Sequence, residues 1–342
     1  MTPLRTGILG CGRIAQRHAT ILAGLEDVSL VAFCDENPAN AQQFRQQFGR
    51  GEVYADAETM FEQAGLDLVY ICLPPYAHSN EVALACQYKV HFLIEKPIAL
   101  TMELAKQMEA QVKTAGVKTQ VGFMYRHGEA ALWLKRYMAE MHPPARGFMM
   151  GRYACNSLHR PWWRDRARSG GQLVEQVIHI VDLARFYLGE PVEVYSVQDN
   201  LFHRHVPDYT VEDVSVTIIR FDTGSIATIS ATNGAIPGRW DCDWRLVLPG
   251  LTADFQDPNH AVFHQTSQTW PSAVTVAAEK DMYLAQTLDL LAAIRDDRPT
   301  AVPIEEGVRS LGLALAATRS ATTGAPVVMA TSTAGVSSNG QR

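Results

Sequence analysis

The chain has 342 residues, of which 47% are hydrophobic and 19% charged, and its formal net charge is −6 at pH 7. This length allows two domains of ordinary size, and the composition is that of a globular protein. A mildly acidic chain lacks the basic surface that nucleic-acid binding requires. No apolar stretch reaches the roughly 18 residues of a membrane span, so neither nucleic acid nor a membrane is an expected partner.

The cysteines indicate a reducing compartment. None of them forms a C-x-x-C pair, and several lie in apolar runs, at positions 11, 34, 72, 86, 155 and 242. This pattern is typical of reduced, buried thiols and not of a disulfide framework or a zinc site. The N-terminal MTPLRTGILG leads directly into a strand-like run, without the pattern of a signal peptide. We therefore expect a cytoplasmic protein.

The first part of the chain alternates short apolar runs with longer stretches of helical period. Helices are expected between strands at 5–10, 28–35, 68–74, 90–97 and 117–123. Near-continuous apolar strands separated by helices are typical of a parallel sheet that is covered on both faces. With right-handed crossovers, residues 1–122 are predicted to form a doubly wound Rossmann domain that binds NAD(P).

The second part changes character after residue 122. A helix is expected over 128–140, and prolines 143 and 144 then interrupt the chain. Strand-like runs dominate from there on, interrupted by one amphipathic helix at about 171–188 and followed by helices at about 279–297 and 305–323. The predicted class is thus α/β plus α+β, with residues 123–330 forming an open, mostly antiparallel sheet covered by helices on one face. A C-terminal helix can return to the first domain, and 331–342 reads as a disordered tail.

A glycine-rich turn follows the first strand in GILGCGRIAQRHA, residues 7–19. Gly10 permits the tight turn, Gly12 lets a pyrophosphate approach the backbone, and the small Ala15 allows close helix–strand packing. The phosphates are expected at the helix N-terminus, where free N–H groups favour anions. The adjoining cofactor-binding candidates are Arg13 and Ile14.

Asp35 ends the second strand, about 20 residues past the glycines. A carboxylate there can accept hydrogen bonds from the adenosine ribose and repels a 2′-phosphate, so NAD is preferred over NADP. NADP is disfavoured but not excluded, because Arg13 could still reach a phosphate. The alternative for Asp35 is a loop-capping residue after a strand.

The segment LPPYAHSN, residues 73–80, follows a strand at the edge where open α/β sheets bind ligands. Leu73, Pro74 and His78 can wall the nicotinamide side of the cofactor. The same segment can equally be a strand-to-helix turn, with His78 or Ser79 near the helix cap.

The segment IEKP, residues 94–97, ends the next strand at the same edge. Lys96 would lie close to the nicotinamide, where a fixed ammonium can stabilise a developing alkoxide or polarise a carbonyl. Glu95 can hydrogen-bond nearby groups. Taken alone, a lysine at a strand end is more often simply solvated.

In the second domain, EQVIHIVD places Glu175, His179 and Asp182 at i, i+4 and i+7. At about 100° per residue they fall on one side of a helix. A polar arc opposite an apolar one is also the pattern of a plain amphipathic helix, and this arc includes Gln172 and Gln176. Asp182 could contact a substrate, orient His179 or pair with Arg185 at i+3.

Taken together, these pieces resemble the glucose–fructose oxidoreductase / inositol dehydrogenase / rhizopine-catabolism (Gfo/Idh/MocA) family. The resemblance covers nearly the whole chain in the family's order. It rests on the glycine turn, CD at 34–35, LPPYAHSN, EKP at 95–97, GFMYRH at 122–127, SGGQLVEQVIHIVDLARFYLGE at 169–190 and VPIEEGVRSLGLALAATRSATTGAPV at 302–327. Three positions depart from the common pattern and indicate a subfamily: Glu175 in place of Asp, Val177 in place of Gly, and Met124 in place of Asn.

The resemblance implies a nicotinamide-dependent dehydrogenase or reductase acting on CH–OH groups of sugars, cyclitols or related polyols and keto-sugars. It assigns Lys96 to the family's EKP lysine, and Glu175 and His179 to its Asp-x-x-x-His pair. In the resulting hypothesis His179, with a pKa near ~6.5, is the general acid/base and Lys96 stabilises the alkoxide. Glu175 is expected to orient His179 and raise its basicity.

Substrate contacts are also expected outside this helix. If the resemblance holds, Tyr125 and Arg126 face the cleft. Trp162 and Trp163, in a Trp- and Arg-rich segment, could stack on a sugar ring or belong to a core or interface loop. Substrate specificity is expected in loops 155–170 and 233–240. The HRH motif at 203–205 has no further spaced ligands, so no metal is expected.

The leading hypothesis is an enzyme, and the alternative is a non-catalytic NAD- and sugar-binding sensor or scaffold of the same fold. Retention of Lys96, Glu175 and His179 favours the enzyme, since a sensor need not keep them. An antiparallel sheet with helices on one face leaves the other face to be covered. We therefore expect a homodimer or homotetramer that assembles through the C-terminal sheet.

Overall fold

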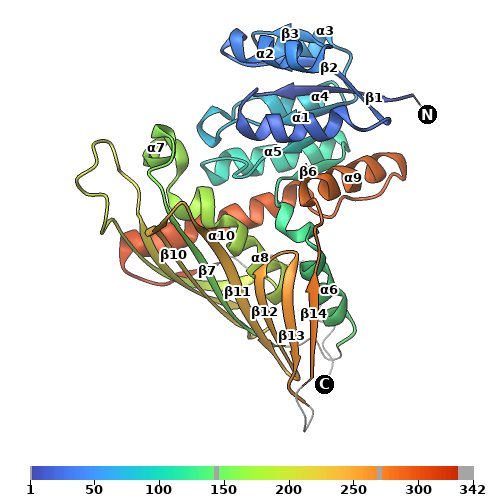
Figure 1. The fold of residues 1–342 in the computed structure, drawn as a ribbon. Coiled ribbons are helices and arrows are strands. Elements are labelled where there is room, and N and C mark those ends of the chain that lie inside the picture. The colour runs from blue at the N-terminus through green and yellow to red at the C-terminus, as the bar shows by residue number, and fades with distance from the viewer. Residues whose placement is uncertain (1, 142–145, 268–271, 330–342) are drawn as a thin grey trace, which may run out of the picture.

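The computed structural model describes residues 2–141, 146–267 and 272–329. The predicted break at prolines 143 and 144 and the predicted tail at 331–342 lie outside these residues. Two sheets stand one above the other, with helices between them (Figure 1). The six cysteines are free thiols, five of them buried and Cys242 partly so.

The first sheet is six-stranded and parallel, in the order β3-β2-β1-β4-β5-β6. Its strands are β1 (Leu4–Leu9), β2 (Val28–Cys34), β3 (Glu52–Tyr54), β4 (Leu68–Ile71), β5 (His91–Ile94) and β6 (Thr119–Val121). The strand order reverses between β1 and β4, which is where doubly wound sheets bind their ligands. The predicted Rossmann fold is confirmed. The short β3 was missed because none of its residues is fully buried, so the sequence carries no apolar run there.

Helices cover both faces of this sheet: α1 (Arg13–Ala23), α2 (Pro38–Phe48), α3 (Ala57–Gln63), α4 (Glu81–Gln87) and α5 (Met102–Ala115). Successive side chains of a strand point to opposite faces. Accordingly Ile8 and Phe33 belong to one apolar cluster, whereas Leu9 and Cys34 belong to another. The strands are shorter than predicted at their carboxyl ends. Leu73 and Lys96 therefore lie in loops just beyond β4 and β5.

The second sheet is nine-stranded, in the order β14-β13-β12-β11-β7-β10-β9-β8-β15. All neighbours pair antiparallel except β7 with β10, which are parallel. The strands are β7 (Phe148–Asn156), β8 (Pro191–Asp199), β9 (Val214–Phe221), β10 (Ile226–Pro237), β11 (Trp240–Leu248), β12 (Leu251–Asp257), β13 (His260–Gln265), β14 (Ser272–Ala277) and β15 (Val327–Val328). The predicted open, mostly antiparallel sheet is confirmed.

Helices α6 (Glu129–Ala139) and α8 (Ile178–Leu188) share an apolar core with one face of this sheet. Strand β9 shows the resulting alternation, with buried residues at every second position. Its intervening residues Val216 and Ile218 are 48% and 43% exposed, and neighbouring strands expose further apolar side chains on the sheet: Phe148, Met150, Tyr195, Val197, Ile226 and Val247. We call these eight residues the open sheet face.

The last two helices join the sheets. Leu290 and Leu291 of α9 (Met282–Arg295) lie in the apolar cluster formed by α1, β1 and β4 of the first sheet. Helix α10 (Ile304–Thr323) contacts α5 on one side and β8 and α8 on the other, and it crosses between the two sheets in Figure 1. A C-terminal helix does therefore pack on the first domain. Both C-terminal helices, α9 and α10, contact the first domain.

Candidate active site

The glycine turn lies at the switch point of the first sheet. Gly10 has φ +86°, and a Cβ there would stand 2.8 Å from the carbonyl oxygen of Cys72, so only glycine fits without strain. A Cβ on Gly12 would meet nothing within 4 Å, which leaves the backbone open on that side. No side chain caps the start of α1 at Gly12. Its free N–H groups, next to Arg13 and Ile14, fit a pyrophosphate.

Asp35 lies just beyond β2, and its carboxylate accepts hydrogen bonds from the neighbouring loops. Its Oδ2 accepts the Cys11 N–H at 2.8 Å, and its Oδ1 accepts the Asn37 N–H at 2.9 Å and the Asn40 side-chain amide at 3.0 Å. The loop-capping alternative is thus realised. The carboxylate is half-exposed at the edge where a ribose would lie, so capping does not remove it from a dinucleotide site.

His78 belongs to the strand-to-helix turn at the start of α4. Its Nδ1 lies 2.6 Å from Glu81 Oε1, and Glu81 Oε2 accepts the Ser79 N–H at 2.7 Å. The side chain of His78 is wholly buried, so it anchors the start of α4 and does not line an open surface. Leu73 and Pro74 are half-buried in the loop just beyond β4.

Glu95 and Lys96 point in different directions after β5. Glu95 Oε1 lies 2.8 Å from Nε2 of the buried His18 on α1, and Glu95 Oε2 accepts the Lys96 N–H. Lys96 reaches the second domain, where its Nζ donates to the Glu175 carbonyl oxygen at 2.7 Å and to Glu175 Oε1 at 3.0 Å. The side chain of Lys96 is only 15% exposed. The solvated alternative for this lysine is therefore wrong.

The helix that carries Glu175 and His179 is buried on all sides. Every residue from Leu173 to Arg185 is buried, so its polar arc meets other parts of the protein and not water. The prediction of a plain amphipathic helix is wrong for this reason. The segment Leu173–Val177 is a π-helical turn that leads into α8. Such turns alter the α-helical spacing of side chains and often occur at functional sites.

Glu175 pairs with Lys96, and no hydrogen bond joins it to His179. The predicted Glu175–His179 contact is thus not formed, because the ammonium attracts the carboxylate more strongly than a neutral imidazole does. His179 instead packs between aromatic rings, with ring centroids 4.8 Å from Tyr125 and 6.0 Å from Phe123. Its Nδ1 is buried without a partner among the described residues.

The environment of His179 makes it neutral. Burial, and then the positive charge of Lys96, lower the pKa of His179 well below its usual 6.5. The expected pKa near 6.5 is corrected accordingly, since both influences act against the imidazolium. Because the charge of Lys96 shifts this pKa, the two side chains lie close enough for their charges to interact. A neutral imidazole beside a fixed ammonium can accept a proton from a hydroxyl group.

Arg126 and Asp182 are paired with each other, not open to a ligand. The guanidinium donates to both Asp182 oxygens at 2.7 Å, and Ser310 Oγ of α10 donates to Asp182 Oδ1. The two side chains are 6% and 1% exposed. The expected substrate contacts are replaced by a closed ion pair that ties α8 to the loop after β6. Arg185, the other proposed partner, binds Glu190 and Glu306.

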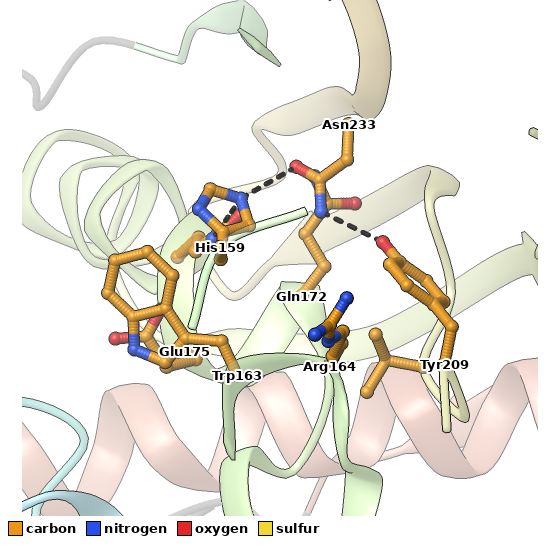
Figure 2. Close-up of a pocket in the computed structure, with 9 residues that line it drawn as sticks. His159, Trp163, Arg164, Gln172, Glu175, Tyr209 and Asn233 are labelled. Carbon is orange, nitrogen blue, oxygen red and sulfur yellow. Dashed lines mark hydrogen bonds between the residues drawn. The ribbon is translucent and has the colours of Figure 1, made fainter. Parts of the chain in front are cut away.

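A small pocket adjoins Glu175 on the side of the second domain (Figure 2). Trp163 and Arg164 enter it from the 3-10 turn Pro161–Arg164, and Gln172 enters from the start of the buried helix. The remaining lining residues are His159, Glu175, Gln176, Tyr209, Val211 and Asn233. Most of these residues lie in or next to loops 155–170 and 233–240, where substrate specificity is expected. His159, Arg164, Tyr209 and Asn233 were missed as individuals because no motif marks them.

Trp162 does not line this pocket. Its ring packs on Trp163 at 5.4 Å and on Tyr76 of the first domain at 6.1 Å. Trp162 therefore belongs to a packed loop between the domains, whereas Trp163 lines the pocket. His203 of the HRH motif binds Asp213. Over residues 2–141, 146–267 and 272–329, no group of metal-ligating side chains is clustered.

Two sheets arranged in this way, with a lysine from the first meeting a carboxylate and an imidazole of the second, define a two-domain dinucleotide-dependent oxidoreductase. Residues 4–123 match the family described as "Oxidoreductase family, NAD-binding Rossmann fold", and residues 147–253 match the "GFO/IDH/MocA C-terminal domain". The chain belongs to the Gfo/Idh/MocA family of oxidoreductases. In the described part of the chain, no helix has the length and apolarity to cross a membrane.

Several relatives are similar over most of the chain. Myo-inositol 2-dehydrogenase of Thermotoga maritima is 26% identical over 333 residues, which cover 93% of this chain and 96% of that protein. The scyllo-inositol 2-dehydrogenase (NAD(+)) of Bacillus subtilis is 28% identical over 235 residues, 67% of each chain. A levoglucosan dehydrogenase in complex with NADH and levoglucosan has the same fold, with a TM-score of 0.88 at 20% identity over 96% of this chain and 99% of that one.

Proposed function

We propose that this chain transfers a hydride between NAD and a CH–OH group of a sugar, cyclitol or related polyol, or the corresponding keto-sugar. The observation that carries the proposal is the contact between Lys96 and Glu175 beside the neutral His179. The lysine comes from the cofactor domain and the other two residues from the second domain. A substrate that contacts Lys96, Glu175 and His179 together must therefore bind between the two domains.

In the oxidation direction, NAD bound at the glycine turn would supply the hydride acceptor. His179 takes the proton of the reacting hydroxyl, and the C–H hydride leaves from the same carbon, so that a carbonyl forms. Lys96 stabilises the alkoxide that develops as the proton departs. Glu175 acts on Lys96 and not on His179, because it fixes the ammonium through a carboxylate and a carbonyl oxygen.

The choice of NAD rests on Asp35, whose half-exposed carboxylate would repel the 2′-phosphate of NADP. The substrate class is supported by relatives named for oxidation of myo-inositol, scyllo-inositol and D-glucosides. A sensor or scaffold would bind the same ligands, but it would have no need of a buried lysine aimed at the second domain.

A reduction screen tests this function. The purified chain is assayed for NAD⁺ and NADP⁺ reduction with inositols, pyranoses, methyl glycosides and sugar acids, and for NADH oxidation with keto-sugars. Turnover with at least one polyol, faster with NAD than with NADP, is expected. Binding of NAD and a sugar without turnover by any candidate would support the sensor instead.

We also propose that the chain self-associates through the open sheet face. Its apolar side chains lie on the exposed face of the second sheet, and they include Val216 and Ile218. A two-fold pairing is the simplest closed way to cover such a surface. Light scattering should give a dimer or tetramer for the protein and a smaller species for Val216→Arg. A monomer at micromolar concentration would contradict the proposal.

A further inference from the structure

The first domain contains a buried histidine that the proposed mechanism does not use. His18 lies on α1, and its side chain is wholly buried. Its Nε2 lies 2.8 Å from Oε1 of Glu95, whose side chain is only 8% exposed. A buried polar pair of this kind adds little stability compared with an apolar pair of the same volume. Stability alone therefore does not explain why these two side chains meet.

Both members of the pair are confined by their surroundings. The ring centroid of His18 lies 5.1 Å from that of Tyr70 on β4 and 5.6 Å from that of Tyr283 on α9. A Cβ on Gly122, just after β6, would come within 2.5 Å of Glu95 Oε2. The carboxylate of Glu95 thus fills the space that the missing side chain of Gly122 leaves. Neither partner can move far while the other stays in place.

Glu95 also binds the backbone of Lys96. Its Oε2 accepts the Lys96 N–H at 3.2 Å, while its Oε1 is bound to His18. At the other end of the same residue, the Lys96 ammonium donates to two oxygens of Glu175. A lysine side chain has a flexible four-carbon stem, so the position of the ammonium depends on where the backbone is held. The first domain holds the backbone of Lys96, and the second domain holds its ammonium.

Helix α1 connects the pair with the predicted cofactor site. The helix begins at Arg13, directly after Gly12 of the glycine turn, and His18 lies on its second turn. The hydrogen bond to Glu95 therefore joins the helix whose N-terminus fits a pyrophosphate to the strand end that carries Lys96.

We propose that His18 is a positioning residue, which holds the Lys96 backbone through Glu95 and so keeps the ammonium where the alkoxide forms. This inference rests on the proposed function for the role of Lys96. It adds a residue of the first domain that acts on the reaction through two others. The competing explanation is that His18 only stabilises the first domain.

Two substitutions of His18 separate its hydrogen bond from its packing. His18→Gln loses the ring but can still donate an N–H to Glu95, whereas His18→Leu fills a similar volume without any donor. Gly122→Ala disturbs the Glu95 carboxylate from the opposite side and leaves His18 in place.

His78→Leu is the matched control. His78 is also wholly buried in the first domain, and it also binds a glutamate, Glu81, which accepts the backbone N–H of Ser79. The hydrogen bonds of that pair anchor the start of α4, and in the described part of the chain none of them involves Lys96.

The first measurement needs no turnover. The charge of Lys96 adds to burial in lowering the pKa of His179, so this pKa reports where the ammonium lies. It is measured by NMR titration of the protein with isotope-labelled histidine rings, and the His179 signal is identified by its loss in His179→Asn. In His18→Leu and Gly122→Ala the pKa of His179 should rise toward its value in Lys96→Met. In His18→Gln and His78→Leu it should stay at the wild-type value.

The second measurement is steady-state kinetics on the substrate found by the reduction screen. His18→Leu and Gly122→Ala should lower kcat by up to about 10²-fold, because a displacement of about 1 Å at a reacting group can cost that much. The KM for NAD should stay close to that of the wild type, since the glycine turn is unchanged. His18→Gln should recover most of the lost kcat. Thermal unfolding gives the stability of every variant.

The inference is overturned if His18→Leu lowers the Tm but changes neither the pKa of His179 nor kcat. Equal losses in His18→Gln and His18→Leu also overturn it, because packing and not the hydrogen bond would then matter. If His18→Leu does not fold, Gly122→Ala decides, and an unshifted pKa of His179 in that variant refutes the inference. The proposed function fails separately, when no polyol is oxidised although the pKa of His179 responds to His18 as expected.

Discussion

The segment from Leu173 to Leu188 carries two carboxylates, Glu175 and Asp182, and each is paired with a cation from outside the helix. Glu175 meets Lys96 through one carboxylate oxygen and a carbonyl oxygen, and both side chains keep some exposure, 8% and 15%. Asp182 meets Arg126 through two parallel hydrogen bonds, and it is 1% exposed.

The two pairs differ in geometry, and under the proposed function they also differ in role: the Lys96 pair belongs to the reaction site, whereas the Arg126 pair stabilises the fold. The planar guanidinium of Arg126 binds both oxygens of its carboxylate and ties the helix to the loop after β6. The ammonium of Lys96 is a single point charge with one N–H donor beyond its two bonds to Glu175. Its charge lowers the pKa of His179, and its partner Glu175 lines a pocket. Identical charges on one helix thus play different parts because of what surrounds them.

The largest effect should come from removing Lys96 or His179, the two side chains proposed to act on the substrate. Lys96→Met and His179→Asn should each lower kcat by about 10²–10⁴-fold, the usual worth of a positioned proton acceptor or charge. NAD binding should persist, since the glycine turn is untouched. The measurement is steady-state kinetics on the substrate found by the reduction screen. Lys118→Met is a matched control, because Lys118 also forms an ion pair, with Asp297, but lies away from the cleft.

Breaking the buried Arg126–Asp182 pair should lower the stability of the fold. Arg126→Met leaves Asp182 buried and without its main partner, so the free energy of unfolding should fall by about 3–5 kcal/mol. The double variant Arg126→Met/Asp182→Leu should lose less than the sum of the two single changes. Urea unfolding measures both. A loss from Lys96→Met as large as that from Arg126→Met would erase the distinction between the two pairs.

A third carboxylate, that of Asp35, is expected to determine the preference for NAD over NADP. Asp35→Asn keeps an oxygen for the Cys11 N–H but removes the charge. The ratio of kcat/KM for NAD to that for NADP should fall by at least about tenfold, because hydrogen bonds to charged groups are worth about 1.5–3 kcal/mol. An unchanged ratio would mean that Asp35 serves only to cap the loop.

The first domain could be predicted from sequence almost completely, because its signals are local. A glycine with a left-handed φ, apolar strands and the residues at their carboxyl ends are each readable in a short window. Gly10, Asp35 and Lys96 lie where that pattern put them. The three-residue β3 could not be predicted, since it has no apolar run.

The second domain was harder because its site is made by contacts distant in sequence. The polar arc of the buried helix resembles a solvated face in the sequence. Its carboxylates form ion pairs with residues 96 and 126, and residue 310 adds a hydrogen bond. The Glu175–His179 contact was expected from the family resemblance, and the π-helical turn at Leu173–Val177, which alters the side-chain spacing there, has no sequence signature. His159 and Asn233, 74 residues apart, become neighbours only when β10 pairs with β7.

The central claim is that His179, kept neutral by burial and by Lys96, is the proton acceptor. The most direct measurement is the pH dependence of kcat/KM for polyol oxidation in the wild type, Lys96→Met and His179→Asn. The base must be unprotonated, so activity should stay level as the pH falls through 6.5 and decline only below it, because the pKa of His179 is lowered. In Lys96→Met the decline should move to higher pH, and in His179→Asn it should vanish. A wild-type decline at or above pH 6.5 that remains in His179→Asn would contradict the account.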